Sequence, residues 1–175
     1  MYRDLALHLA RNGFVVALPE HPGNHRDDRS LTGTVENLTN RPRHLRAVID
    51  FACAEWRISS VAVVGHSLGG YTGLALVGGK PTASPHETGG EPEPLAVEHD
   101  DRVQALVLLA PATPWFMLDG ALDDVRVPIL MLSGEKDEHT TSWHASQDPP
   151  GFDRVAYQER MKAEVLEFLQ RYARK

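Results

Sequence analysis

The chain has little cysteine and no excess of positive charge. Cys53 is the single cysteine among 175 residues, so no disulfide forms within the chain and no redox pair of thiols exists. Lysine and arginine number 18 against 24 acidic residues, which gives a net charge of −6 at pH 7. Nucleic acids and anionic membranes both select a basic surface, and the charge therefore argues against either as a partner.

Long apolar runs are also missing. The longest apolar stretch covers residues 105–118, is shorter than a membrane span, and is interrupted by Pro111 and Pro114. The first residues, 1–5, carry charges where a secretory signal would place its apolar segment. These absences predict a cytoplasmic protein. The length fits one domain, residues 1–175, and 42% hydrophobic content is ordinary for a globular protein.

One stretch is more informative than the rest: Val61-Ala62-Val63-Val64-Gly65-His66-Ser67-Leu68-Gly69-Gly70. A β-branched run enters the pattern Gly-x-Ser-x-Gly, and residues 71–77 follow with spacing that suits a helix. Strand, sharp turn and helix are the context of a nucleophile elbow, with Ser67 strained at the turn. Gly65 and Gly69 then let strand and helix approach closely, and the Leu68 N–H can stabilise an oxyanion. The alternative is an incidental glycine-rich turn.

Hydrophobic runs elsewhere predict an α/β fold with three α/β/α layers and a mostly parallel sheet. Buried strands are expected at 14–18, 61–64, 103–109 and 127–132, and helices at 4–12, from Asn40-Arg41-Pro42 to Trp56, and from Asp153 onward. The segment 80–101 is rich in proline, glycine and acidic residues. It reads as a flexible, exposed excursion with nothing that builds a core.

The sequence around Ser67 resembles the elbow of α/β-hydrolases, and similarity to serine esterases of the dienelactone-hydrolase and platelet-activating-factor-acetylhydrolase types extends over most of the chain. The resemblance implies a triad in the chain order Ser, acid, His. Asp137, which follows the strand predicted at 127–132, occupies the position of the acid. Glu135, Glu138 or a solvated run of charges are the alternatives.

The same resemblance implies features that this sequence lacks. No strand-length apolar run with a histidine-bearing loop separates Asp137 from the final helix, so the chain reads as shortened there. His144 is the preferred base, His139 is too close to the acid, and the absence of any base is an open alternative. The chain also reads as shortened at its start, without the strand expected between 14–18 and 61–64 or the loop with the second oxyanion donor. Those two strands then pair directly or leave a gap that favours association with another copy.

Two further groups carry weaker signals. Trp115 and Phe116, with Met117, are candidates for an apolar wall that receives substrate, and ordinary packing beneath a loop is an equal alternative. The segment containing His21 and His25 with nearby acids (Asp27, Asp28) resembles a metal site, but a solvated turn is favoured because no helix holds these side chains on one face. We therefore expect no metal and no cofactor.

These features predict a serine hydrolase that cleaves small carboxylic esters through an acyl-enzyme on Ser67. The alternative is a shortened, catalytically impaired hydrolase-like domain that acts as a binding or assembly module, or a fragment of a longer enzyme. Nucleic acid and membrane are not expected as partners, and a homo-oligomer is an open alternative.

Overall fold

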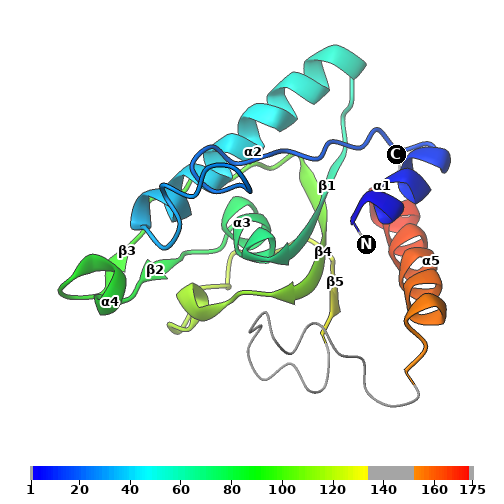
Figure 1. Cartoon of the computed structure of the whole chain (residues 1–175). Coiled ribbons are helices and arrows are strands. Elements are labelled where there is room, and N and C mark those ends of the chain that lie inside the picture. The colour runs from blue at the N-terminus through cyan, green and yellow to red at the C-terminus, as the bar shows by residue number, and fades with distance from the viewer. Residues whose placement is uncertain (1, 134–151, 174–175) are drawn as a thin grey trace.

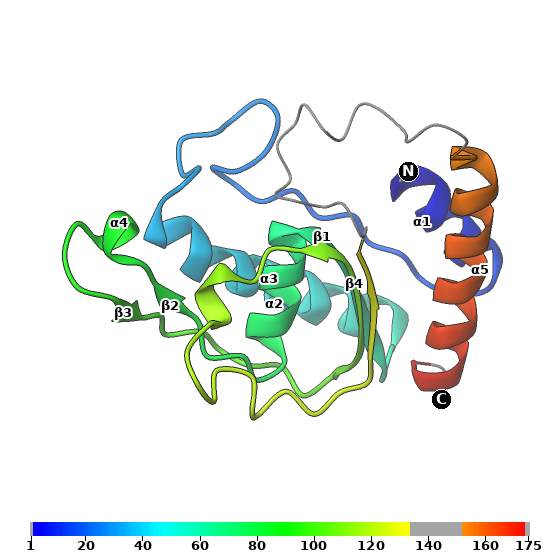
Figure 2. The ribbon, with the colours of Figure 1, turned by 90° about the horizontal axis from the view of Figure 1, so that it is seen from below.

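A computed structural model of the protein describes residues 2–133 and 152–173. Its main sheet has three parallel strands in the order β1-β4-β5, namely β1 (Val61–Ser67), β4 (Val103–Pro111) and β5 (Ile129–Leu132). Helices α1 (Tyr2–Arg11) and α5 (Arg154–Tyr172) lie on one face, and α2 (Val35–Trp56) and α3 (Leu68–Leu76) lie on the other (Figures 1 and 2). This is the layered α/β arrangement that the sequence predicts.

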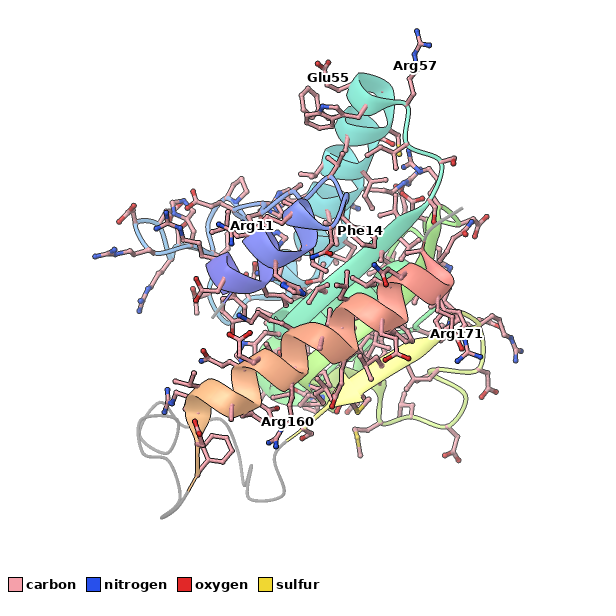
Figure 3. All side chains as sticks on the ribbon, turned by 90° about the vertical axis from the view of Figure 1, so that its right-hand side faces the viewer. Arg11, Phe14, Glu55, Arg57, Arg160 and Arg171 are labelled. Atoms are coloured by element: carbon pink, nitrogen blue, oxygen red, sulfur yellow. The ribbon has the colours of Figure 1, made fainter. Side chains whose placement is uncertain are left out.

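Strand β4 lies at the centre of the core because its side chains alternate between the two layers. Val103, Leu106 and Leu108 pack with α2 and α3, whereas Ala105, Val107 and Leu109 pack with α1 and α5. All six are at most 5% exposed. A strand buried on both faces is read from sequence as a continuous apolar run, and for β4 that prediction is confirmed. Figure 3 shows α5 running along the strands in front of them, with α1 beside β1.

Helix α2 begins earlier than the sequence predicts. Thr34 caps it, since its Oγ1 accepts a hydrogen bond from the Asn37 N–H at 3.1 Å, and Pro42 lies inside the helix. Proline is common in a first turn, which is why a start near Asn40 was expected. Pro42 has no N–H to donate to the carbonyl of Leu38, and the Tyr71 hydroxyl from α3 donates to that carbonyl instead, at 3.1 Å.

Residues 14–18 are not a strand, and this prediction is wrong. Within the described chain β4 is the only sheet neighbour of β1, and residues 14–18 lie across a cavity from it. Phe14 and Val16 are partly buried and pack toward α5, whereas Val15 and Leu18 are 51% and 65% exposed, so this apolar run is covered on one side only. A strand needs a partner edge, and no strand of the described residues pairs with this segment.

The segment 80–101 does contribute to the core, contrary to the expectation. It contains β2 (Thr82–Ala83) and β3 (Glu93–Pro94), which pair antiparallel, and the short helix α4 (Pro85–Thr88). Ala83 and Leu95 belong to the core on the α2 and α3 side. The composition of the segment does not predict this packing, because two apolar side chains are enough to hold an otherwise polar segment against the domain.

The remaining elements agree with prediction within a few residues. Helix α1 is followed by Gly13 with φ 89°, as expected for a helix that ends in a left-handed glycine. Asp153 caps α5 by accepting a hydrogen bond from the Ala156 N–H at 3.0 Å. Met161, Val165 and Leu169 form the buried face of α5.

Candidate active site

Ser67 stands at the junction of β1 and α3 in a strained backbone conformation. Its φ is 49° and its ψ is −117°, a region that L-residues with a Cβ rarely occupy. Strand β1 ends at Ser67 and α3 begins at Leu68, so the strand–turn–helix context that the motif requires is present. Strain of this kind persists only where surrounding structure holds it.

Close backbone packing around Gly65 holds the turn. A Cβ on Gly65 would lie 2.3 Å from the carbonyl oxygen of Gly69, so only glycine fits there. The motif predicts the same role for Gly69, but a Cβ on Gly69 would meet nothing within 4 Å. Gly70 is the second constrained position, because its Cβ would lie 2.5 Å from that of Pro111.

The carboxyl end of β4 supports the turn from the other side. Ala112 donates its N–H to the Ser67 carbonyl at 2.9 Å, and Pro111 pairs with Ser67 in the sheet register. Ala110 has a φ of 41°, so two strained residues lie at neighbouring strand ends. Ala110 lies directly before Pro111, which pairs with Ser67, and no local sequence motif predicts its positive φ.

Ser67 directly precedes the first turn of α3 in the chain. Leu68 is the first residue of that helix, and the N–H groups of a first turn have no acceptor within the helix. The Leu68 N–H is therefore free to face negative charge, assisted by the helix dipole. Ser67 is partly exposed, and within residues 2–133 and 152–173 no side chain hydrogen-bonds its hydroxyl.

The predicted acid and base, Asp137 and His144, both lie outside the described residues, as do the alternatives Glu135, Glu138 and His139. His66, next to the nucleophile, is described. Its ring packs on Tyr2 of α1 with centroids 5.4 Å apart.

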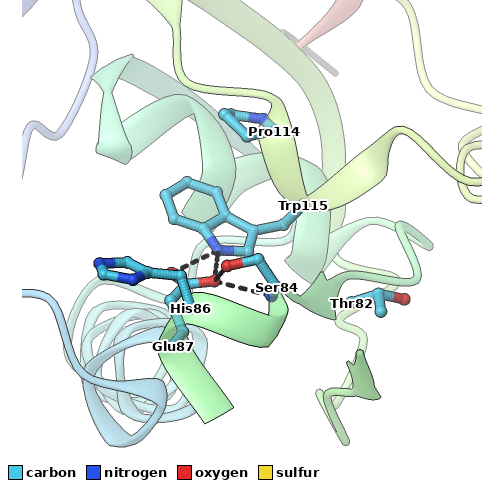
Figure 4. Close-up of a pocket in the computed structure, with 6 residues that line it drawn as sticks. All are labelled: Thr82, Ser84, His86, Glu87, Pro114 and Trp115. Carbon is cyan, nitrogen blue, oxygen red and sulfur yellow. Dashed lines mark hydrogen bonds between the residues drawn. The ribbon is translucent and has the colours of Figure 1, made fainter. Parts of the chain in front are cut away.

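Trp115 and Phe116 lie in a short 3-10 helix, η1 (Pro114–Phe116). Phe116 is 6% exposed and packs on Tyr71, so in this structure its ring is part of the core. Trp115 contacts the same Tyr71 ring and donates its Nε1–H to the Glu87 carboxylate at 2.9 Å (Figure 4). The third candidate, Met117, is 78% exposed.

Two cavities flank this region, and Ser67 lines neither of them. The smaller, about 210 Å³, is lined by Trp115, Glu87 and neighbours from α4 (Figure 4). Burial raises the pKa of Glu87, but hydrogen bonds from Ser84 and Trp115 outweigh it and leave that pKa below its ordinary value. The larger, about 780 Å³, lies between β1, α2 and residues 13–19, and includes Gly65, His66 and Gly69 of the elbow in its wall.

The segment after residue 20 is held by local hydrogen bonds. The Asp28 carboxylate accepts from the N–H groups of Gly23 and Ser30, and the His25 ring accepts from the Asp27 N–H. Among the described residues no three histidine, cysteine or acidic side chains are grouped so as to hold a metal ion. Nor does this part of the chain contain a helix with the length and apolar character needed to cross a membrane.

Parallel strands between helical layers, with a strained serine where a strand passes into a helix, define an α/β-hydrolase. A family model described as serine aminopeptidase S33 (Hydrolase_4) matches residues 1–88, just over half of the 175 residues. The chain belongs to this hydrolase family. A comparison with curated proteins found no significant match, and a comparison with solved structures found none either.

Proposed function

We propose that the protein is a serine hydrolase that cleaves small carboxylic esters through an acyl-enzyme on Ser67. The observation that carries this proposal is the backbone of Ser67, strained between β1 and α3. Ser67 immediately precedes Leu68, the first residue of α3, which is the chain position that a serine nucleophile and its oxyanion donor occupy in a nucleophile elbow. The closer kinship with dienelactone-hydrolase-like esterases is part of the proposal.

In the proposed first step the Ser67 hydroxyl attacks the ester carbonyl while His144 takes its proton. Asp137 orients the imidazole, and the Leu68 N–H stabilises the tetrahedral oxyanion. The carbon–oxygen bond to the alcohol then breaks, and the alcohol leaves with the proton from His144. Water attacks the acyl-enzyme in the second step and gives a proton to His144. The tetrahedral intermediate then breaks its bond to the Ser67 oxygen, which takes that proton back from His144, and the carboxylic acid is released.

A peptide or aminoacyl amide is the second candidate substrate, because the matched family is described as a serine aminopeptidase. Esters are preferred on chemical grounds. Within the described residues Leu68 supplies the one oxyanion donor that we can name, and a missing second donor typically costs about 3 kcal/mol of transition-state stabilisation. Esters tolerate such a loss better than amides because an alkoxide leaves more readily than an amine.

The test compares hydrolysis of p-nitrophenyl butyrate with that of alanine p-nitroanilide. We expect turnover of the ester, reduced to background by Ser67→Ala and by His144→Ala, whereas His139→Ala serves as the matched control and retains activity. Faster cleavage of the anilide would make the protein an amidase. Ester turnover that survives Ser67→Ala would contradict the proposed nucleophile, and an inactive wild type would favour the binding or assembly module.

A further inference from the structure

Arg41 is a buried cation that has no acidic partner among residues 2–133 and 152–173. Its side chain comes from α2 and is 7% exposed. Nε donates to the Thr72 hydroxyl at 3.0 Å and Nη1 donates to the Asn24 side-chain oxygen at 2.7 Å, and both of these acceptors are neutral. Within the described ranges no aspartate or glutamate forms an ion pair with it. Buried charges in proteins are normally paired with an opposite charge, so the buried guanidinium of Arg41 favours a bound anion as its partner.

The groups around Arg41 do not supply that negative charge. Burial lowers the pKa of Arg41 to about 10, which still leaves it charged at neutral pH. The His21 and His44 rings lie close together, and burial, followed by Arg41 and His44, lowers the pKa of His21 to about 4. His21 is therefore neutral at pH 7. Burial likewise raises the pKa of Tyr71 far above neutrality, so its phenol stays protonated.

Arg41 opens onto the larger cavity, whose wall is otherwise mainly apolar. Its lining includes Phe14, Leu45, Val48 and Val64. The charged side chains in the described wall are Arg41 and Arg57, both cationic, and none is acidic. A cavity of about 780 Å³ with an apolar wall and a buried guanidinium has the composition of a small-molecule site.

Arg41 also retains donors for such a ligand. A guanidinium has about five N–H donors, and the bonds to Thr72 and Asn24 use two of them. Those two bonds tie the head group to α3 and to the loop at residue 24, so its orientation is fixed in advance. A planar guanidinium held in this way matches a planar carboxylate, which can accept two N–H bonds side by side.

We infer that the larger cavity binds an aliphatic carboxylate, with its carboxylate on Arg41 and its chain along the apolar wall beside β1. The elbow residues Gly65 and Gly69 line the same cavity, so the bound molecule lies beside the elbow, although Ser67 itself is not part of the cavity wall. Binding involves no covalent step. Carboxylate binding can therefore be tested separately from the proposed hydrolysis, and Ser67→Ala should bind the carboxylate as tightly as the wild type does.

The test is calorimetric titration of the full chain with octanoate and with octanol, which has the same chain length but no charge. We expect the wild type to bind octanoate at least about tenfold more tightly than octanol. Arg41→Gln should abolish that preference. Arg43→Gln is the matched control, because Arg43 lies on the same helix but is exposed, and it should leave the preference unchanged.

Two further variants separate binding from folding. Arg41→Lys keeps the charge and should retain part of the preference for octanoate, even if it loses the bonds to Thr72 and Asn24. Val48→Phe fills the cavity and should weaken both ligands while sparing Arg41. No octanoate binding by the folded wild type, equal binding of octanoate and octanol, or an unaltered preference in folded Arg41→Gln would each overturn the inference.

Discussion

The backbone at Ser67 depends on two neighbouring residues that have no side chain. Gly65 lets the carbonyl of Gly69 approach to a distance that any Cβ would block, and Gly70 does the same for Pro111. Gly69 itself has open space around the position of a Cβ and lies within α3. The motif Gly-x-Ser-x-Gly therefore contains one glycine that sterics require and one that they do not.

This difference predicts opposite results for two alanine substitutions. Gly65→Ala places a methyl group against backbone and should cost about 3 kcal/mol or more of the free energy of unfolding. Gly69→Ala should be neutral, or should stabilise by up to about 1 kcal/mol, because alanine favours a helix. Chemical denaturation of both variants measures the difference. Equal destabilisation would contradict the described packing of the elbow.

At the scale of elements, Pro42 and Tyr71 form one unit that joins two helices. Proline inside α2 leaves the Leu38 carbonyl without its helical donor, and the Tyr71 hydroxyl from α3 replaces it. Tyr71 is completely buried, and its ring contacts both Trp115 and Phe116. The hydroxyl thus compensates for the proline and fixes how α2 and α3 pack together.

Tyr71→Phe should therefore destabilise the protein more than loss of a hydroxyl at the surface. It leaves the Leu38 carbonyl buried without a donor, which costs about 1–3 kcal/mol. Tyr172→Phe is the matched control at a position 37% exposed, and it should change the free energy of unfolding by less than about 0.5 kcal/mol. Thermal unfolding of the two variants compares them directly, and equal transition temperatures would contradict the account.

Sequence patterns predict some of these elements correctly and others wrongly, and the difference has a physical reason. Runs such as residues 103–109 were identified correctly because burial on both faces of a parallel strand leaves a continuous apolar signal. Residues 14–18 carry the same signal but have no strand beside them, and apolarity does not report hydrogen-bond partners. The sequence predicts Arg41 only as part of a helix start. No sequence pattern indicates that its side chain is buried without an acidic partner among the described residues.

The candidate site could likewise be predicted from the sequence only where its features are local. The strand, turn and helix around Ser67 follow from a local motif, whose glycines and neighbouring apolar residues carry the information. Support from Ala110 and Pro111 depends on β4 meeting β1, which is a tertiary contact with no local signature. The roles of Asp137 and His144 remain predictions, because both residues lie outside the described ranges.

At the scale of the whole molecule, β1 lies at an edge of the described sheet and faces a cavity. Val61 donates its N–H to the Arg102 carbonyl and Ala112 donates its N–H to the Ser67 carbonyl, so alternate residues of β1 bond toward β4. By this alternation Val63 and Gly65 face β4, and the amide of Val64 faces the cavity. An uncovered edge of this kind is also where another chain could add a strand.

Amide hydrogen exchange tests this arrangement of β1. In the monomer the Val64 amide should exchange at least about a hundredfold faster than those of Val63 and Gly65, because only the latter two donate to β4. The comparison is made at several protein concentrations. Protection of Val64 that grows with concentration would indicate that a second copy covers the edge, whereas equal protection at every dilution would contradict the described sheet.

The central claim is that the fold holds Ser67 as a nucleophile at the end of β1, and covalent labelling tests it most directly. We predict that a fluorophosphonate adds once to the intact protein, that peptide mapping places the adduct on Ser67, and that Ser67→Ala abolishes it while Ser60→Ala does not. A folded protein that shows no adduct, or one whose adduct persists in Ser67→Ala, would contradict the account.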